Sequence, residues 1–209
     1  NLENRIQGHS DSPLTSLGLK QAEAIAQRLA AEHFDAIYSS DLGRAVATAE
    51  IIAAKQTSIL SESKGAGSAI RKTELLRELN LGVAQGMTAK EFAETYPEEY
   101  RLWSTYAVEH RPPGAESIES LTDRCREFVE QVLREHKDEE RLAVVGHSGS
   151  QRGLVCAALD LPVEYYKNLS VANAALSIVE IGDRPTLRLY NDICHLHNIE
   201  VTVSDVDAG

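Results

Sequence analysis

The feature that most constrains the fold is a short apolar run that ends in a glycine and a histidine. Residues 142–145 are Leu-Ala-Val-Val, apolar at every position, which is typical of a strand buried on both faces of a parallel sheet. Gly146 and His147 follow at once, and residues 151–159 then have the pattern of a helix. Because parallel strands are joined by crossover helices, this unit predicts an α/β fold.

The rest of the chain alternates in the same way. The helical pattern recurs over residues 17–31, from about 41 to 55, over 88–103 in two pieces broken at Pro97, and over 117–136. Strand patterns recur over residues 34–38, 175–181 and 186–190, whereas 57–71 has the composition of a loop. We find neither an internal repeat nor a linker long enough to separate two domains. The sequence therefore predicts one domain, residues 1–209, as a three-layer α/β/α sandwich with a mostly parallel sheet.

Composition excludes several classes of protein. The net charge of -11 argues against a nucleic acid or an anionic membrane surface as partner. The three cysteines, Cys125, Cys156 and Cys194, have no CxxC spacing, so we expect reduced thiols rather than disulfides or a zinc site. No apolar run approaches the length of a membrane span. We expect a cytoplasmic protein with no metal and no other cofactor; the sequence also allows a homodimer.

Two segments have the form of an anion site, which in α/β sheets lies beyond the carboxyl ends of the strands. Arg44 falls in the first turn of its helix, where the helix dipole disfavours a cation unless it faces a bound anion. A solvated surface arginine explains that segment equally well. His147 follows the end of the buried strand, beside small residues that leave room for a ligand, and Arg152 lies just inside the next helix.

Residues 146–150 also allow a different enzyme, a serine hydrolase. Gly-His-Ser-Gly-Ser resembles the nucleophile elbow G-x-S-x-G with Ser148 as the nucleophile, but Ser150 replaces the last glycine. The other members of a triad would be Asp183 or Asp192 and His195 or His197, which is the right chain order. Because no HGGG-type oxyanion segment lies upstream, we disfavour this interpretation.

Taken together, the segments resemble the histidine phosphatase superfamily in its phosphoglycerate-mutase-like branch. The family opens with R-H-G-E-T-x-W-N and continues R-x-Q-G-x-x-D-x-P-L-T; this chain starts at the asparagine, Asn1, and matches the second motif over residues 5–15. Residues 38–49 match S-S-D-L-x-R-A-x-x-T-A, and residues 76–86 match L-R-E…G…G. Three later matches are residues 113–117 to P-G-G-E-S, 144–152 to V-V-S-H-G-G-x-x-R, and 191–196 to N-D-x-x-H-L. Ala115, Gly146 and Ser148 depart from these motifs.

The resemblance implies a metal-independent phosphomonoester hydrolase that acts on a small phosphorylated metabolite through a phosphohistidine. It assigns Glu78 as the proton donor to the leaving alcohol and later the base for water. It also implies a set of residues that bind the phosphoryl group, build its pocket or contact the substrate at the entrance: Asn1, Arg5, Gln7, Gly8, Arg44, His147 and Ser148. Arginines and a histidine around a phosphoryl group suit the chemistry, because phosphoryl transfer is catalysed mainly by positioning and charge stabilisation. Substrate selectivity should come from residues 61–71 and from the helices between 88 and 110.

One departure concerns the nucleophile. The nucleophilic histidine and its neighbouring arginine belong to the R-H-G segment, which would precede Asn1, and none of the other histidines has such a context. We therefore expect residues 1–209 to be a histidine-phosphatase domain that lacks its first strand. Two alternatives stay open: a catalytically inactive phosphate-binding relative, and a phosphoglycerate mutase. The mutase is disfavoured because residues 77–82, Arg-Glu-Leu-Asn-Leu-Gly, do not match the mutase form E-R-H-Y-G.

Overall fold

The computed structural model describes residues 5–56, 70–105 and 110–199. Its central feature is a parallel sheet of β1 (Ala36–Ser40), β2 (Arg71–Thr73) and β3 (Leu142–Val145), in the order β2-β1-β3. The register pairs Tyr38 with Val144 on one side of β1 and with Arg71 on the other. All three strands therefore end at the same edge of the sheet.

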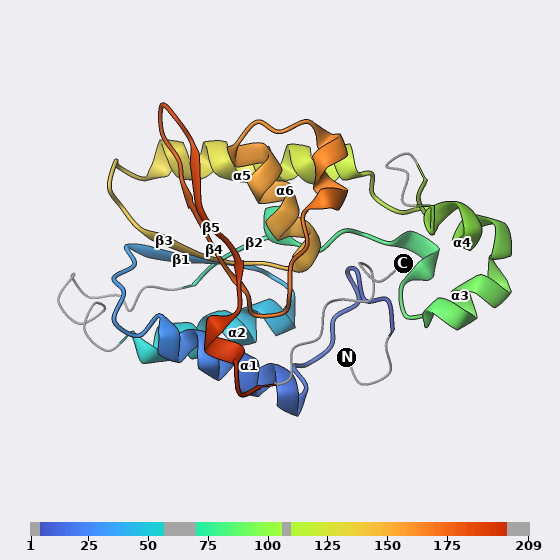
Figure 1. Cartoon of the computed structure of the whole chain (residues 1–209), viewed down its shortest axis with the longest axis horizontal. Coiled ribbons are helices and arrows are strands. Elements are labelled where there is room, and N and C mark those ends of the chain that lie inside the picture. The colour runs from blue at the N-terminus through green and yellow to red at the C-terminus, as the bar shows by residue number, and fades with distance from the viewer. Residues whose placement is uncertain (1–4, 57–69, 106–109, 200–209) are drawn as a thin grey trace.

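Helices cover both faces of this sheet (Figure 1). On one face lie α1 (Ser16–Arg28) and α2 (Gly43–Lys55), and on the other lie α5 (Ile118–Glu135) and α6 (Ser148–Ala158). Two short helices, α3 (Ala89–Thr95) and α4 (Pro97–Trp103), stand to one side of the sandwich. This arrangement confirms the predicted α/β fold with helices on both faces of a mostly parallel sheet.

Local sequence signals explain where several helices begin. Thr15 accepts a hydrogen bond from the Gly18 amide at the start of α1, and Ser117 caps α5 in the same way. Thr88 and Glu91 form a reciprocal capping box at α3. Pro97 occupies the first turn of α4, where its missing N–H costs nothing, so the predicted break at this residue separates two helices.

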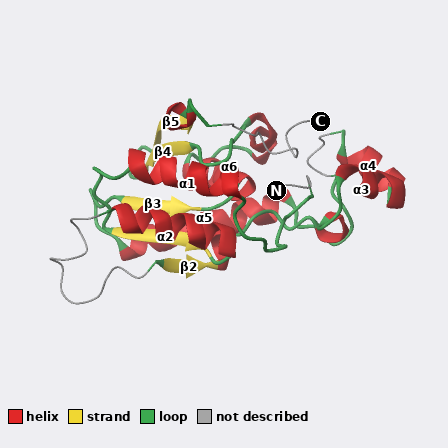
Figure 2. Ribbon diagram, turned by 90° about the horizontal axis from the view of Figure 1, so that it is seen from below, coloured by secondary structure: helices red, strands yellow, loops and turns green. Residues whose placement is uncertain are grey.

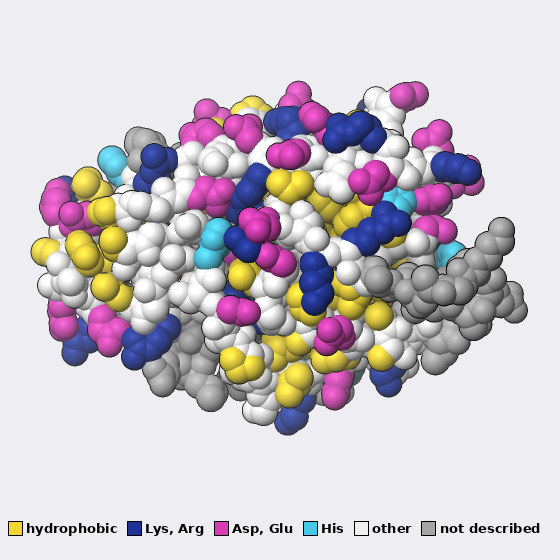
Figure 3. Space-filling model, turned by 180° about the vertical axis from the view of Figure 1, so that it is seen from behind, with side chains coloured by type: hydrophobic (Ala, Val, Ile, Leu, Met, Phe, Trp, Pro, Cys, Tyr) yellow, Lys and Arg dark blue, Asp and Glu magenta, His cyan; other side chains and the backbone are white. Residues whose placement is uncertain are grey.

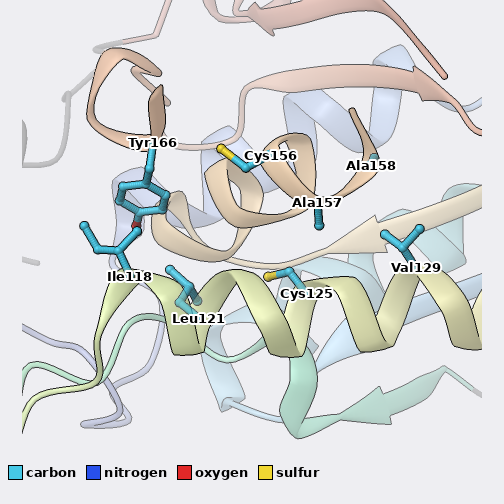
Figure 4. Close-up of a cluster of buried hydrophobic side chains, with 8 residues drawn as sticks. All are labelled: Ile118, Leu121, Cys125, Val129, Cys156, Ala157, Ala158 and Tyr166. Carbon is cyan, nitrogen blue, oxygen red and sulfur yellow. The ribbon is translucent and has the colours of Figure 1, made fainter. Parts of the chain in front are cut away.

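The core between α5 and α6 is the largest buried apolar cluster (Figure 4). Leu121 and Cys125 of α5 pack against Cys156 of α6, and the ring of Tyr166 closes one end. Both cysteines are free and buried, and burial raises the pKa of the Cys125 thiol to about 12. These thiols are core residues, and α6 is fixed against α5 along its length.

A second, antiparallel pair of strands lies beyond β3. It consists of β4 (Leu176–Glu180) and β5 (Thr186–Asp192), and in the described part of the chain it forms a sheet of its own (Figure 2). Between β3 and β4 runs a cavity of about 2080 Å³, lined by both strands and by residues of all four flanking helices. Ile25, Val129 and Val155 are among its apolar lining residues. The cavity thus lies within the sheet layer itself.

Three expectations differ in detail from the structure. The helix expected from residue 151 begins at Ser148, so Arg152 lies in its second turn rather than its first. The strand expected over residues 34–38 spans Ala36–Ser40. Residues 70–73 were assigned partly to a loop, but Arg71–Thr73 form the edge strand β2; most of that loop, residues 57–69, lies outside the described residues.

The acidic side chains behind the net charge of -11 are not gathered in one place on the face of the molecule that Figure 3 shows. On the face seen in Figure 3, acidic and basic side chains are interspersed, so that face carries no large patch of one sign. Within the described ranges, no helix is both long and apolar enough to cross a bilayer.

Candidate active site

The parallel topology brings three chain segments together at the carboxyl edge of the sheet. Ser40 is the last residue of β1 and Asp41 follows it, Glu78 follows β2 after one short turn of helix, and His147 follows β3. Because parallel strands end at a common edge, segments 37 to 107 residues apart in sequence become neighbours there. Arg44 reaches the same place from the first turn of α2.

Arg44 is a half-buried cation at this edge, with its side chain 12% exposed. Its guanidinium donates to the carbonyl oxygens of Gly8 (2.8 Å) and Ser10 (2.9 Å), and a carboxylate oxygen of Asp11 lies 3.9 Å away. Burial lowers the pKa of Arg44, and the charges of Glu78 and Asp11 partly offset that effect. An arginine stays protonated at neutral pH, so the site holds a positive charge whose ionic partner among the described residues is a loose one. Such a charge favours an anionic ligand.

His147 lies buried at the start of α6. Its Nε2 atom is hydrogen-bonded to the hydroxyl of Ser40 at 2.9 Å, and its backbone N–H donates to Ser150. Burial, followed by the nearby charge of Arg44, holds the pKa of His147 well below 6.5. The ring is therefore neutral at pH 7 in the free protein, and a bound anion would favour its protonation.

The carboxylate of Glu78 lies at the N-terminus of α6. Its Oε1 atom accepts hydrogen bonds from the backbone N–H groups of Leu79 (2.7 Å) and Gly149 (2.9 Å), and its Oε2 atom accepts one from the Ser148 hydroxyl (3.1 Å). Helix N-termini favour carboxylates because their first N–H groups have no partner within the helix. The helix that follows His147 thus also orients Glu78.

Two arginine–carboxylate pairs hold the backbone around Glu78. Arg77 binds Asp41 with two hydrogen bonds, and these lower the pKa of Asp41. Arg124 of α5 binds Glu116 through two further hydrogen bonds, of 2.7 and 3.0 Å, and its NH2 group also donates to the carbonyl oxygen of Glu78 at 3.0 Å. These two-pronged contacts fix the segment from both sides.

His9 provides a third contact to this segment. Its Nε2–H donates to the same Glu78 carbonyl oxygen at 2.8 Å, and its backbone N–H donates to the side chain of Gln85. The preceding residue, Gly8, has φ of +52°, and a Cβ atom there would lie 2.3 Å from the Gln85 oxygen. A side chain at this position would strain the backbone and crowd Gln85, so glycine is favoured in the loop that carries His9.

Most of the predicted site residues line one cavity, but Arg5 has a second role and Asn1 is not described. Arg44, Glu78, His147 and Ser148 line the same cavity, together with Gln7 and Gly8 from the N-terminal loop. Gln7 donates to Ser12 at 2.8 Å. Arg5 lines the cavity as well, but its guanidinium pairs with Glu91 at 2.8 Å and binds the Gly86 carbonyl, so it also ties the N-terminal segment to α3. Asn1 lies outside the described residues.

Sequence reasoning missed three residues of the site: His9, Arg124 and Gly149. Gly149 could have been suspected, since glycine in the first turn of a helix allows another chain close to the backbone. A Cβ atom at Gly149 would lie 2.1 Å from Glu78 Oε1. His9 and Arg124 carry no local signal, because their roles depend on contacts with a segment far away in the sequence.

The geometry does not assemble the alternative serine hydrolase. The hydroxyl of Ser148 donates to a carboxylate rather than to an imidazole. His195, one of the two candidate bases, accepts a hydrogen bond from Arg28 and donates to the carbonyl of Ala174. Asp192 binds the same arginine, so these residues connect α1 to the end of β5. Among the described residues, no group of three or more His, Cys, Asp or Glu could hold a metal ion.

Comparisons with known proteins agree with the motifs. A family model described as "Histidine phosphatase superfamily (branch 1)" matches residues 1–193. "Phosphoserine phosphatase 1" of Hydrogenobacter thermophilus is 33% identical over 194 residues, which cover 92% of this chain and 86% of that protein. "Metal-independent phosphoserine phosphatase" of Arabidopsis thaliana is 36% identical over 203 residues, which cover 95% of this chain and 79% of that protein.

Solved structures show the same fold. A mycobacterial glucosyl-3-phosphoglycerate phosphatase superposes with a TM-score of 0.77 at 29% identity, over 91% of this chain and 92% of that chain. YhfR of Bacillus stearothermophilus superposes with a TM-score of 0.78 at 28% identity, over 94% and 93% of the two chains.

The likeness therefore extends beyond short motifs. It spans nearly the whole chain in sequence and in structure, and the resemblance inferred from the sequence is confirmed. This chain belongs to branch 1 of the histidine phosphatase superfamily, a family of enzymes.

Proposed function

We propose that the protein is a cytoplasmic phosphomonoesterase for a small phosphorylated metabolite and that it works through a phosphohistidine. The observation that carries the proposal is the convergence of Arg44, His147 and Glu78 on one cavity. A fixed cation and a histidine beside it stabilise an anion, and a carboxyl group at the edge can transfer a proton. The relatives named as phosphoserine phosphatases make phosphoserine the first substrate to test.

The reaction has two steps that balance in atoms and charge. First, a histidine nitrogen attacks phosphorus, the P–O ester bond breaks, and Glu78 gives its proton to the leaving alcohol oxygen. Second, water attacks the phosphohistidine, its proton passes to the Glu78 carboxylate, the N–P bond breaks and inorganic phosphate leaves. Arg44 and His147 stabilise the charge on the phosphoryl oxygens in both steps.

The nucleophilic histidine belongs to a strand that lies in the cavity between β3 and β4. Support comes from the lining of the cavity, which has a strand on either side and apolar helix residues such as Ile25 and Val129 on its two faces. A strand there would join the two sheets into one. If it runs parallel to β3, its carboxyl end reaches the edge where Arg44 and His147 lie.

Hydrogen exchange on the full-length protein tests this part of the proposal. The backbone N–H groups of β3 and β4 that face the cavity should be protected as strongly as those between β1 and β3. Rapid exchange of the cavity-facing groups, with protection of the others, would refute the inserted strand.

The activity itself is tested by phosphate release from phosphoserine by the full-length protein in the presence of a chelator. His147→Ala and Glu78→Ala should each lower kcat/KM by about 10²-fold or more, since charge stabilisation and proton transfer each contribute at least that much. Unchanged turnover in both variants would contradict the site assignment. Activity that disappears with the chelator and returns with a metal would contradict the mechanism.

Two other functions are separated by simple measurements. A phosphoglycerate mutase would convert 3-phosphoglycerate to its isomer with little release of phosphate, and several relatives carry the name "Probable phosphoglycerate mutase GpmB". We favour the phosphatase because residues 77–82 do not match the mutase form. An inactive relative would bind phosphate without turnover. The homodimer stays a prediction that sedimentation can test.

A further inference from the structure

The two oxygens of the Glu78 carboxylate have chemically different partners. Oε1 accepts hydrogen bonds from two backbone N–H groups, of Leu79 at 2.7 Å and of Gly149 at 2.9 Å. Oε2 accepts its bond from the hydroxyl of Ser148 at 3.1 Å. A backbone N–H group can only donate, whereas a hydroxyl group can donate or accept. The two sides of the carboxylate therefore respond differently when a proton is added.

A proton cannot be placed on Oε1 without breaking hydrogen bonds. Two N–H groups already point at this oxygen, and a proton on it would face one of them. A proton on Oε2 needs only that the Ser148 hydroxyl rotates, so that its oxygen accepts instead of donating. The arrangement thus selects Oε2 as the oxygen that carries the proton.

The carbonyl end of Glu78 is fixed as firmly as its carboxylate end. His9 Nε2 and Arg124 NH2 donate to the backbone carbonyl oxygen at 2.8 and 3.0 Å. The side chain therefore has little freedom to bring Oε1 forward in place of Oε2. A residue held at both ends presents the same oxygen to every substrate.

We propose that Ser148 is a positioning residue for the proton transfer, which keeps Glu78 Oε2 in place in both of its protonation states. This inference rests on the proposed function, in which Glu78 passes its proton to the leaving oxygen. As the proton leaves Oε2, negative charge develops there, and the Ser148 hydroxyl turns to donate to it. The hydrogen bond is stronger in the transition state than in the acid form, which is the condition for accelerating the step.

This role differs from a direct contact with the phosphoryl group, which the family resemblance suggested for residue 148. The hydroxyl is engaged with Glu78, and the family motif has glycine at this position, which has no side chain to bind phosphate. In this chain the partner of the Ser148 hydroxyl is the proposed acid, Glu78, rather than the phosphoryl group.

The test compares two phosphate esters in the full-length protein. Phosphoserine has an alkoxide leaving group that needs a proton, whereas p-nitrophenyl phosphate releases a stable phenolate that needs little help. The value of kcat/KM reports steps up to the first phosphoryl transfer, where the acid acts. The variants are Ser148→Ala, Ser148→Gly, Ser148→Thr and, as the reference for loss of the acid, Glu78→Gln.

Loss of one hydrogen bond to an ionised group predicts a selective effect. For Ser148→Ala and Ser148→Gly, kcat/KM for phosphoserine should fall by about 10- to 100-fold. For the aryl ester, kcat/KM should fall by less than about twofold. Ser148→Thr keeps the hydroxyl group and should stay within about twofold of wild type for both esters. Inhibition by inorganic phosphate should not change. In the Glu78→Gln background, Ser148→Ala should cause no further loss.

The outcomes separate the inference from the proposed function. If Glu78→Gln lowers kcat/KM equally for both esters, Glu78 is not the acid, and the proposed function loses its proton donor. A second outcome is that Glu78→Gln lowers kcat/KM only for phosphoserine, whereas Ser148→Ala and Ser148→Gly lower kcat/KM equally for both esters and weaken inhibition by phosphate. Ser148 then contacts the phosphoryl group, and only the inference is overturned. Wild-type kinetics in both deletions would overturn it as well.

Discussion

Replacing Gly149 by alanine gives the most direct test of how the acid is positioned. Gly149 lies in the first turn of α6 with helical backbone, so alanine is compatible with its conformation. A Cβ atom at this position would lie 2.1 Å from Glu78 Oε1 and 3.0 Å from the Tyr166 hydroxyl oxygen. The contact of 2.1 Å is far too short, so Oε1 must move away, whereas the contact with Tyr166 is only tight.

The size of the effect follows from that retreat. Oε1 has to move by about 1 Å to reach ordinary contact, which breaks or weakens its hydrogen bond to the Gly149 N–H. A displacement of about 1 Å at a reacting group costs on the order of 10²-fold in rate. Loss of a hydrogen bond to a charged group, about 1.5–3 kcal/mol, gives a similar factor. We expect kcat/KM for phosphoserine to fall by about 10- to 100-fold.

The thermal stability of Gly149→Ala should change far less than its kcat/KM. Alanine is favoured over glycine in helices by about 1 kcal/mol, which offsets part of the strain. Thermal unfolding of Gly149→Ala should therefore stay within a few degrees of wild type. Gly182→Ala is the matched control, because a Cβ atom there meets nothing within 4 Å, and it should leave both properties unchanged. Wild-type kcat/KM in Gly149→Ala would refute the claim that this close approach positions Glu78.

Three further predictions concern the surroundings of the site and the fold. Arg124→Met leaves the Glu116 carboxylate, which is only 13% exposed, without its ionic partner. The free energy of unfolding, measured in urea, should therefore fall by about 3 kcal/mol. An unchanged free energy of unfolding would show that the ion pair is dispensable. His9→Leu removes one donor to the backbone carbonyl of Glu78, the proposed proton donor, and should lower kcat/KM for phosphoserine about tenfold. His9→Gln keeps an N–H group at similar reach and should have nearly wild-type kcat/KM. Equal kcat/KM in the two variants would contradict this role of His9. A hydrogen bond from Arg28 and one from the Cys194 N–H hold the pKa of Asp192 at about 2, below its usual value of 3.8. Stability that is present above about pH 4 should therefore decline as the pH falls from about 4 to 2. The decline, followed by thermal unfolding, should be smaller in Asp192→Asn.

Much of the fold could be predicted because the pattern of apolar residues follows it. The strand β3 was predicted at its observed ends, since it is apolar at every position and a glycine follows it. β2 could not be predicted, because Arg71 and Lys72 are exposed at the sheet edge and no apolar pattern marks them. The start of α6 was placed three residues late, since its first turn contains glycine and serines, which are weak helix formers, and has tertiary contacts instead.

The site divides along similar lines. Arg44, Glu78 and His147 were identified from motifs, and the fold brings all three to one cavity. The contacts that hold Glu78 were not predictable. His9 lies 69 positions before Glu78 and Arg124 lies 46 positions after it, and both bind its backbone carbonyl oxygen, which no motif describes. Sequence patterns record which residue types recur, whereas a hydrogen bond to a backbone atom leaves the partner residue free to vary.

The cavity between β3 and β4 gives the strongest physical reason to place a strand there. Removing buried apolar atoms from a protein core costs about 24 cal/mol for each Å³ of cavity that remains. Part of the 2080 Å³ is open to solvent at the proposed substrate site, so this cost applies only to the enclosed apolar part. Because the total stability of a typical domain is only about 5–15 kcal/mol, this cost supports the proposal that protein fills the apolar part of the space. A strand that fills it is held by β3 on one side and β4 on the other, which would fix a histidine at its carboxyl end beside Arg44 with the rigidity that in-line attack on phosphorus needs.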